Sequence, residues 1–357
     1  MWSFDNLNAV HLELSSRCNA ACPGCPRFLR NSPNVDPDLA QRDISLSDFK
    51  SWFSPEILKK IRSWHICGTH GDPITCKDLI EIVSYICEYS DGSIQIHTNG
   101  GARNENFFSK LGKVLSDNTI PGRVRGVVFS VDGLEDTNHL YRRQVKWDKL
   151  IKNMKAYVAT GGMAGWHFLR FAHNYHQIEE AKQLAESLGV HFKVKNPFGV
   201  DGVGMPVYDK SYNLDYVINH YERPEEKPYT PPEIGYIAPM PKKTNKQGCI
   251  ECASFRQYGT LNINEIYIDH LGRVHPCCYV ANKMFGPSIS EEATEVRYIQ
   301  SKLRNKNSLY YHNLKEIIDS DVLKVYSDSW ENKSINQCWV QCGGDRLIDK
   351  LFVREIE

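Results

Sequence analysis

Three cysteines near the start of the sequence have the spacing of a metal site. The segment CNAACPGC places them at Cys18, Cys22 and Cys25, directly after a short run rich in apolar residues. Thiolates are the usual ligands of iron–sulfur clusters, and a cluster held entirely by protein takes four of them. Three thiolates leave one iron open to another molecule. A zinc knuckle or free thiols are the weaker reading, because structural zinc sites are closed by four ligands and no fourth Cys or His lies nearby.

A repeating pattern of strands and helices positions this cysteine segment. Strands are expected at 9–15, 63–67, 93–98, 126–131, 165–171 and 191–195. Amphipathic helices are expected between them, at 76–90, 104–116, 147–162 and 177–190. Strand and helix alternating at this spacing imply parallel βαβ units. Six units suit either an open doubly wound sheet or an incomplete barrel, and in both the chemistry lies at the C-terminal ends of the strands.

Short polar motifs follow three successive strands. The second strand runs into CGTHGDP, the third ends in HTNGG and the fourth ends in FSVDG. Each motif alone is typical of an ordinary turn. Their order carries weight, because each stands at a strand end where one shared site would be assembled. With the Cys-x3-Cys-x2-Cys spacing, they make the chain similar to the radical S-adenosylmethionine (SAM) superfamily.

This resemblance implies a [4Fe–4S] cluster whose open iron is chelated by the amino and carboxylate groups of SAM. The implied SAM-contacting residues are Gly71, Asp72, Thr98, Asn99, Ser130, Asp132 and Arg142. Arg142 matches an arginine that reaches the SAM carboxylate, and Arg143 is the rival for that role. The chain departs from the family pattern at Gly24, where an aromatic residue commonly packs on adenine.

A second group of six cysteines lies in GCIEC, HPCC and CWVQC. The segment IYIDHLGRVHPCC resembles the SPASM or twitch extension, in which two strands around a glycine turn deliver a cysteine to an auxiliary cluster. Two clusters would need eight thiolates, so one auxiliary [4Fe–4S] cluster is expected. The implied ligands are Cys252, Cys277, Cys338 and Cys342, with Cys249 and Cys278 as alternatives to the first two. A structural zinc site is the competing interpretation, since four thiolates also suit Zn²⁺.

The fold expected from this resemblance is an α/β partial (β/α)6 TIM-like barrel followed by a small α+β auxiliary-cluster domain. The predicted boundaries are 1–221 for the barrel, 222–248 for a linker and 249–357 for the auxiliary-cluster domain. Residues 222–247 contain six prolines, which resist both helix and central strand. Beyond them we expect a strand pair that turns at 270–272, and helices near 288–305 and 313–326.

The remaining cysteines and most histidines favour packing roles. Cys67, Cys76 and Cys87 fall in a strand or in helix positions, where buried free cysteine is common. Strand-associated histidines are more often core or rim residues than catalysts. His70 and His97 stand beside motif positions and are candidates for substrate contact or acid–base chemistry.

Composition excludes several classes of protein. Hydrophobic residues make up 41% and charged residues 24% of the 357 positions, as in ordinary globular proteins. The 43 basic and 43 acidic residues cancel, so no overall positive field indicates a nucleic acid partner. No signal peptide and no run of about 18 apolar residues occurs, which favours a cytoplasmic protein without a membrane partner. Twelve cysteines in such a chain favour metal ligation over disulfides.

The function implied by the resemblance is reductive cleavage of SAM to a 5′-deoxyadenosyl radical that abstracts a hydrogen atom from a substrate. An electron donor such as flavodoxin or ferredoxin is the expected partner. An auxiliary cluster can accept a second electron, so we expect an oxidoreductase and a net oxidation. Because the sequence starts a few residues before its first strand, a small polar metabolite or nucleotide-like substrate is favoured over a peptide or protein. A zinc-bearing binding protein without catalysis is the third hypothesis.

Overall fold

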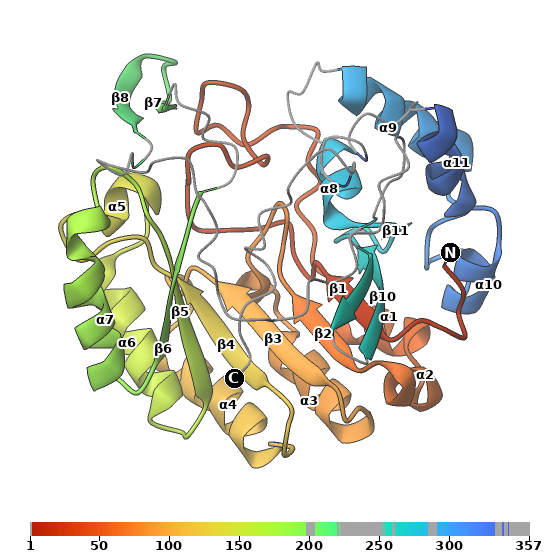
Figure 1. Cartoon of the computed structure of the whole chain (residues 1–357), viewed down its shortest axis with the longest axis horizontal. Coiled ribbons are helices and arrows are strands. Elements are labelled where there is room, and N and C mark those ends of the chain that lie inside the picture. The colour runs from red at the N-terminus through yellow and green to blue at the C-terminus, as the bar shows by residue number, and fades with distance from the viewer. Residues whose placement is uncertain are drawn as a thin grey trace, which may run out of the picture.

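The computed structural model describes residues 2–197, 204–219, 221, 252, 254–258, 261–284, 291–332, 338 and 342. Its centre is a mainly parallel sheet with helices packed on the outside, as Figure 1 shows. Among the described residues no helix is both long and apolar enough to cross a membrane.

All six predicted strands of the first part are present. They are β1 (Ala9–Leu12), β2 (Ser63–Ile66), β3 (Ser93–Thr98), β4 (Arg125–Ser130), β5 (Met163–Leu169) and β6 (His191–Lys195). Each pairs in parallel with the next, so their order in the sheet is their order in the chain. In a doubly wound sheet the order of the strands would instead reverse at a switch point. Sequential order with right-handed crossovers puts the helices on one face, and this confirms the α/β partial barrel.

Helices connect these strands on the outer face. They are α1 (Leu46–Trp52), α2 (Pro55–Lys60), α3 (Leu79–Tyr89), α4 (Glu105–Asp117), α5 (Asn138–Tyr141), α6 (Trp147–Val158) and α7 (Ile178–Ser187), with short 3-10 turns η1 (Pro73–Thr75) and η2 (Tyr175–Gln177). The start of α4 is capped by Asn104, whose side chain accepts a hydrogen bond from the Phe107 amide. The four predicted helices correspond to α3, α4, α6 and α7.

Alternate strand residues face these helices. In β3, Ile94 and Ile96 are fully buried, whereas Gln95 and His97, which alternate with them, are partly exposed on the other face. Aromatic contacts identify the helix-facing side in two further strands: Trp64 of β2 packs on Phe53, and Phe129 of β4 packs on Phe108. Because successive side chains of a strand point to opposite faces, every second residue of these strands projects to the inner face of the sheet.

The C-terminal part extends the same sheet. Strand β10 (Leu261–Ile268) pairs in parallel with β1 and antiparallel with both β9 (Phe255–Tyr258) and β11 (Val274–His275). The predicted strand pair is thus confirmed, and Gly272 in its turn has a left-handed backbone with φ of 69°. The predicted linker 222–248 lies outside the described residues, and the domain boundaries stay predictions.

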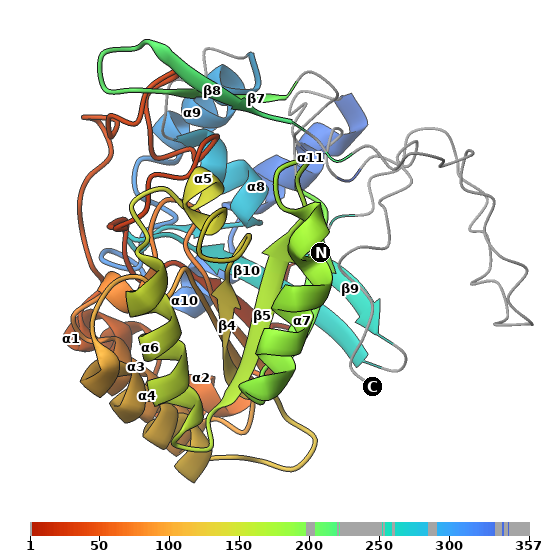
Figure 2. The same cartoon turned by 90° about the vertical axis from the view of Figure 1, so that its left-hand side faces the viewer.

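Helices follow this strand pair. They are α8 (Cys278–Ala281), η3 (Asn282–Met284), α9 (Glu291–Leu303), α10 (Leu314–Asp319) and α11 (Lys324–Asn332). The helix predicted near 313–326 is therefore divided in two. A hairpin of β7 (Met205–Tyr208) and β8 (Leu214–Ile218) was not predicted. Both views place this hairpin on the same side of the molecule as the long loop between β1 and α1, most clearly in Figure 2.

Candidate functional site

The first cysteine group lies in a loop that follows β1. The Cys25 amide donates to the Cys22 carbonyl at 3.3 Å, so the second and third cysteines share one turn. Gly24 between them has φ of 71°, which favours glycine. A Cβ on Gly24 would lie 3.3 Å from the Cε of Met205 in β7. Met205 therefore occupies the space into which a side chain at position 24 would project.

Donor groups surround the three sulfurs. The Sγ of Cys18 accepts from the Ala20 amide at 3.3 Å and from the Asn99 amide nitrogen Nδ2 at 3.4 Å. The Sγ of Cys22 accepts from Nη1 of Arg142 at 3.6 Å. Such donors favour the thiolate form, which is the form that binds metal. The loop thus places Cys18 beside Asn99, which directly follows β3, and Cys22 beside Arg142, which directly follows α5.

Burial opposes ionisation of these thiols. It raises the pKa of Cys18 to about 12, with Asp72 adding to the effect, and that of Cys25 to about 11. The pKa of Cys22 is also raised by burial, although Arg142 counteracts this. Three buried thiols that resist deprotonation are poor nucleophiles, but a bound cation would supply the missing positive charge. The donor set therefore fits a metal cluster.

Arg27 braces the cysteine loop and was missed by the sequence analysis. Its guanidinium donates to the carbonyls of Cys18 at 2.8 Å and Ala20 at 2.6 Å, and the residue is 5% exposed. Two bonds to backbone carbonyls fix the loop conformation rather than bind a ligand. An arginine two residues after the third cysteine was the only signal for this role.

The strand-end motif at Gly71 and Asp72 lies against the end of β1. A Cβ on Gly71 would come within 1.9 Å of the Ser15 carbonyl oxygen, so only glycine fits. The Asp72 carboxylate accepts from Thr98 Oγ1 at 3.0 Å and from the Asn99 amide at 2.8 Å. Burial raises the pKa of Asp72, and these bonds oppose the rise. Asp72 thus ties the second strand end to the third.

Arg142 and Arg143 point to different partners. The Nε of Arg142 donates to Asp132 Oδ2 at 2.6 Å, and Asp132 is fully buried. Asp132 Oδ1 also accepts from the Leu169 amide at 2.6 Å. Arg143 instead reaches the hairpin, with Nη1 bound to the Tyr208 carbonyl at 2.9 Å. The structure therefore places Arg142, and not its neighbour, beside the sulfur of Cys22.

Ser130 is the last residue of β4 and is partly exposed. The cavity beside the cysteine loop has a volume of about 720 Å³. Cys22, Gly24 and Cys25 line one side of it, and the hairpin strand β7 and Arg143 line the other. It is large enough for a ligand of cofactor size.

The second cysteine group also comes together. Cys252, Cys277, Cys338 and Cys342 line one small cavity, closed by aromatic residues that include Trp2, Tyr326 and Trp330. Burial raises the pKa of Cys338 to about 12, and it also raises the pKa of Cys277 well above its usual value. Cys278 does not line this cavity. Its charge instead contributes to the raised pKa of Cys67. Cys249 lies outside the described residues, so its role as an alternative ligand is untested.

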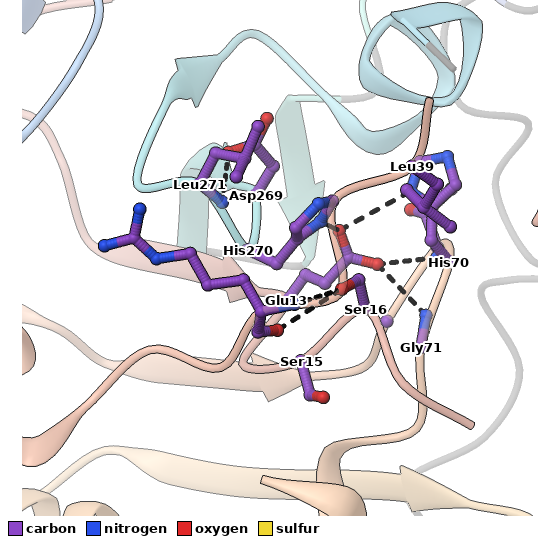
Figure 3. A network of polar contacts seen from close by, with 12 residues as sticks. Glu13, Ser15, Ser16, Leu39, His70, Gly71, Asp269, His270 and Leu271 are labelled. Carbon is purple, nitrogen blue, oxygen red and sulfur yellow. Dashed lines mark hydrogen bonds and ion pairs between the residues drawn. The ribbon is translucent and has the colours of Figure 1, made fainter. Parts of the chain in front are cut away.

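A buried network below the Gly71 motif was not foreseen (Figure 3). Glu13, which follows β1, is fully buried and accepts from the His70 amide at 2.5 Å and the Gly71 amide at 3.3 Å. Its other oxygen meets His270 Nδ1 at 2.8 Å. Burial raises the pKa of Glu13, but the bonds from His270 and His70 lower it more, so it stays ionised. Glu13 therefore couples the motif loop to the β10–β11 turn.

Other predicted residues lie in the core or on the inner face. Cys76 is fully buried and Cys87 packs against the core, as expected for structural thiols. His70 belongs to the Glu13 network. His97 projects from the inner face of β3, one residue before Thr98.

Comparison with known proteins gives similarities at the level of fold. No protein-family model and no curated protein matches the sequence significantly. SuiB of Streptococcus suis bound to S-adenosylmethionine is 15% identical with a TM-score of 0.49, and the match covers 77% of this chain and 61% of SuiB. BtrN in complex with AdoMet and 2-DOIA is 12% identical with a TM-score of 0.42, covering 96% and 94%. The anSMEcpe structure with bound AdoMet is 13% identical with a TM-score of 0.38, covering 53% and 52%. All three structures contain bound S-adenosylmethionine (AdoMet).

Proposed function

We propose that this chain is a radical SAM enzyme that holds a [4Fe–4S] cluster on Cys18, Cys22 and Cys25. The observation that carries the proposal is that Cys18 contacts Asn99, which directly follows β3, while Cys22 of the same loop contacts Arg142, which directly follows α5. Three thiolates leave one cluster iron for SAM. With SAM bound, such a cluster supplies an electron that yields a 5′-deoxyadenosyl radical able to take a hydrogen atom from an unactivated carbon.

The residues of the chain have distinct tasks in this proposal. Arg27 holds the cysteine loop rigid through two backbone carbonyls. Asp72 fixes the conformation of the Thr98–Asn99 turn, and we assign this turn, whose Asn99 contacts Cys18, to the positioning of SAM beside the cluster. Arg142 provides positive charge beside Cys22, held in place by Asp132. We assign Ser130, the last residue of β4, to a contact with the nucleoside.

We further propose that Cys252, Cys277, Cys338 and Cys342 hold one auxiliary [4Fe–4S] cluster. Four thiols on one aromatic cavity support this assignment. Such a cluster accepts the electron that the substrate radical must lose in a net oxidation. The proposed reaction is therefore the oxidation of a small polar or nucleotide-like molecule, with flavodoxin or ferredoxin supplying the first electron.

Iron content and spectroscopy test this proposal. Anaerobically reconstituted protein should hold about eight irons, and replacing Cys338 and Cys342 by alanine should lower this to about four. The electron paramagnetic resonance spectrum of the reduced protein should change on adding SAM in both proteins. Cys76→Ala with Cys87→Ala is the matched control, and it should retain all the iron. About four irons with one zinc in the wild type would contradict the auxiliary cluster, and a spectrum insensitive to SAM would contradict the main proposal.

A further inference from the structure

The inner face of the sheet carries a row of basic side chains that the proposed function does not use. His11 of β1, His65 of β2, His97 of β3 and His167 of β5 follow one another across the strands. Their ring centroids lie 4.3 Å apart for His11 and His65, 4.7 Å for His65 and His97, and 5.5 Å for His97 and His167. The alternation of the strands sends these rings away from the helices.

Two lysines extend this row on β6. Phe192 packs on Trp166 on the helix side, so Lys193 and Lys195 project to the inner face with the histidines. Lys195 acts electrostatically on both His97 and His167. We call the four histidines and two lysines the basic row.

The positive charge of the basic row comes from its lysines, beside histidines that burial keeps neutral. Burial lowers the pKa of His97 to about 3, and the charges of Lys195 and His11 lower it in the same direction. Burial, followed by Lys195, His97 and Lys193, lowers the pKa of His167 to about 2. The pKa of Lys195 is itself lowered by burial and by Lys193. With these low pKa values His97 and His167 are neutral at pH 7, so the positive charge that would stabilise a negative group beside them comes from the lysines.

The basic row lies next to the proposed reaction centre. His97 directly precedes the Thr98–Asn99 turn, and Asn99 contacts Cys18. Asp72 acts electrostatically on both Cys18 and Cys67, which follows His65 by two residues. A molecule held by the basic row would therefore lie inside the barrel at the strand ends that carry the cysteine loop.

We propose that the basic row binds a compact oxyanion, a carboxylate or a phosphate, of the substrate. This inference rests on the proposed function and adds the substrate class to it: an anionic metabolite, oriented by Lys195 and His167 with its reacting carbon toward the cysteine loop. Lysine and histidine side chains donate charge-assisted hydrogen bonds to such groups.

A metal ion is the competing occupant. The ligand atoms of His11, His65 and Cys67 all lie within 4.8 Å of one another, which suits a cation. However, His11 Nε2 already bonds the Cys67 carbonyl at 2.9 Å, and Lys195 acts on Cys67. A cation would be repelled by the lysines of the basic row, whereas an oxyanion would be attracted.

Calorimetric titration of the reconstituted full chain, saturated with SAM, tests this inference. Malonate and inorganic phosphate serve as probes and distinguish the two anion classes. At least one should bind saturably, and Lys195→Met should weaken it roughly tenfold or more, the scale of one lost charge-assisted bond. Lys195→Arg should restore most of the affinity. Lys113→Met, on the exposed face of α4, is the matched control and should bind like the wild type.

The inference would be overturned if neither probe bound saturably, or if Lys195→Met bound a probe as tightly as the wild type. It would also be overturned if SAM excluded the probe, or if the wild type held one equivalent of zinc that the His65→Gln variant lost. Circular dichroism of Lys195→Met and binding by Lys195→Arg separate a lost contact from a lost fold. Intact SAM cleavage by a wild type that binds neither anion would overturn only the substrate class and leave the proposed function standing.

Discussion

Replacement of Arg142 by alanine separates the roles of the two adjacent arginines. The Arg142 guanidinium is paired at 2.6 Å with Asp132, whose side chain has no exposed surface. Removing one partner of a buried ion pair typically costs about 3 to 5 kcal/mol, because the other charge stays buried without compensation. Arg143 pairs with Asp215 at 3.6 Å, and that carboxylate is 48% exposed. Arg143→Ala should therefore cost less than about 1 kcal/mol from this pair.

The cost of Arg142→Ala should depend on pH, because it changes the pKa of Asp132. Burial raises the pKa of Asp132 above its usual value, and Arg142 opposes the rise. Without Arg142 the folded-state pKa of Asp132 rises further, above that of the unfolded chain. A raised pKa means that stability is retained at low pH and lost as the pH increases through the folded-state pKa. The cost of Arg142→Ala should thus be smaller at pH 5 than at pH 8.

Urea unfolding of the metal-free protein, followed by circular dichroism, measures both effects, with Arg143→Ala as the control. SAM affinity of the reconstituted variants gives a second readout. Arg142→Ala should weaken SAM binding by about 1 to 3 kcal/mol if its guanidinium also meets the SAM carboxylate. Equal destabilisation by the two variants, or a larger cost at pH 5 than at pH 8, would refute the reasoning.

Three further changes test the framework of the site. Gly71→Ala should destabilise the fold by about 1 to 3 kcal/mol and weaken SAM binding, because its Cβ would meet the Ser15 carbonyl oxygen at 1.9 Å. Gly165→Ala is the control and should be tolerated, since the nearest contact of its Cβ is 3.7 Å, and equal melting temperatures of the two variants would contradict this. Glu13→Gln should lower the free energy of unfolding by about 3 kcal/mol, since His270 loses a buried charged partner, and an unchanged urea midpoint would show that the network is dispensable. Cluster assembly should release protons and proceed faster at pH 8.5 than at pH 6.5, because burial raises the pKa of Cys18 and Cys25; iron uptake independent of pH would contradict it.

The barrel strands could be predicted from the sequence because the signal for each strand lies within a few consecutive residues. Each strand alternates or runs apolar over a few residues, and each helix between them has an apolar stripe. The β7–β8 hairpin was missed because Met205–Tyr208 contains a proline and its partner Leu214–Ile218 has only five residues, too few for a clear strand pattern. The pairing of β10 with β1 joins residues more than 250 positions apart, and no local pattern determines which strand edge a distant segment meets.

Prediction of the site shows the same limit. The cysteine spacing and the strand-end motifs picked out residues of which several contact one another in the structure, since strand ends of parallel units meet at one edge, and their roles stay predictions. The choice between Arg142 and Arg143 depended on which side of the chain faces the cysteine loop, which only the folded structure shows. Glu13 had a weak signal, a single acidic residue between apolar neighbours at the end of a buried strand. Its partner His270 is distant in sequence, so the network could not be read from it.

Formation of 5′-deoxyadenosine tests the central claim most directly. Anaerobically reconstituted wild type with dithionite and SAM should produce it, and so should the Cys76→Ala, Cys87→Ala control. Simultaneous replacement of Cys18, Cys22 and Cys25 by alanine should abolish it while circular dichroism shows a folded protein. SAM cleavage at the wild-type rate in that triple variant, or no cleavage by an iron-loaded wild type, would contradict the account.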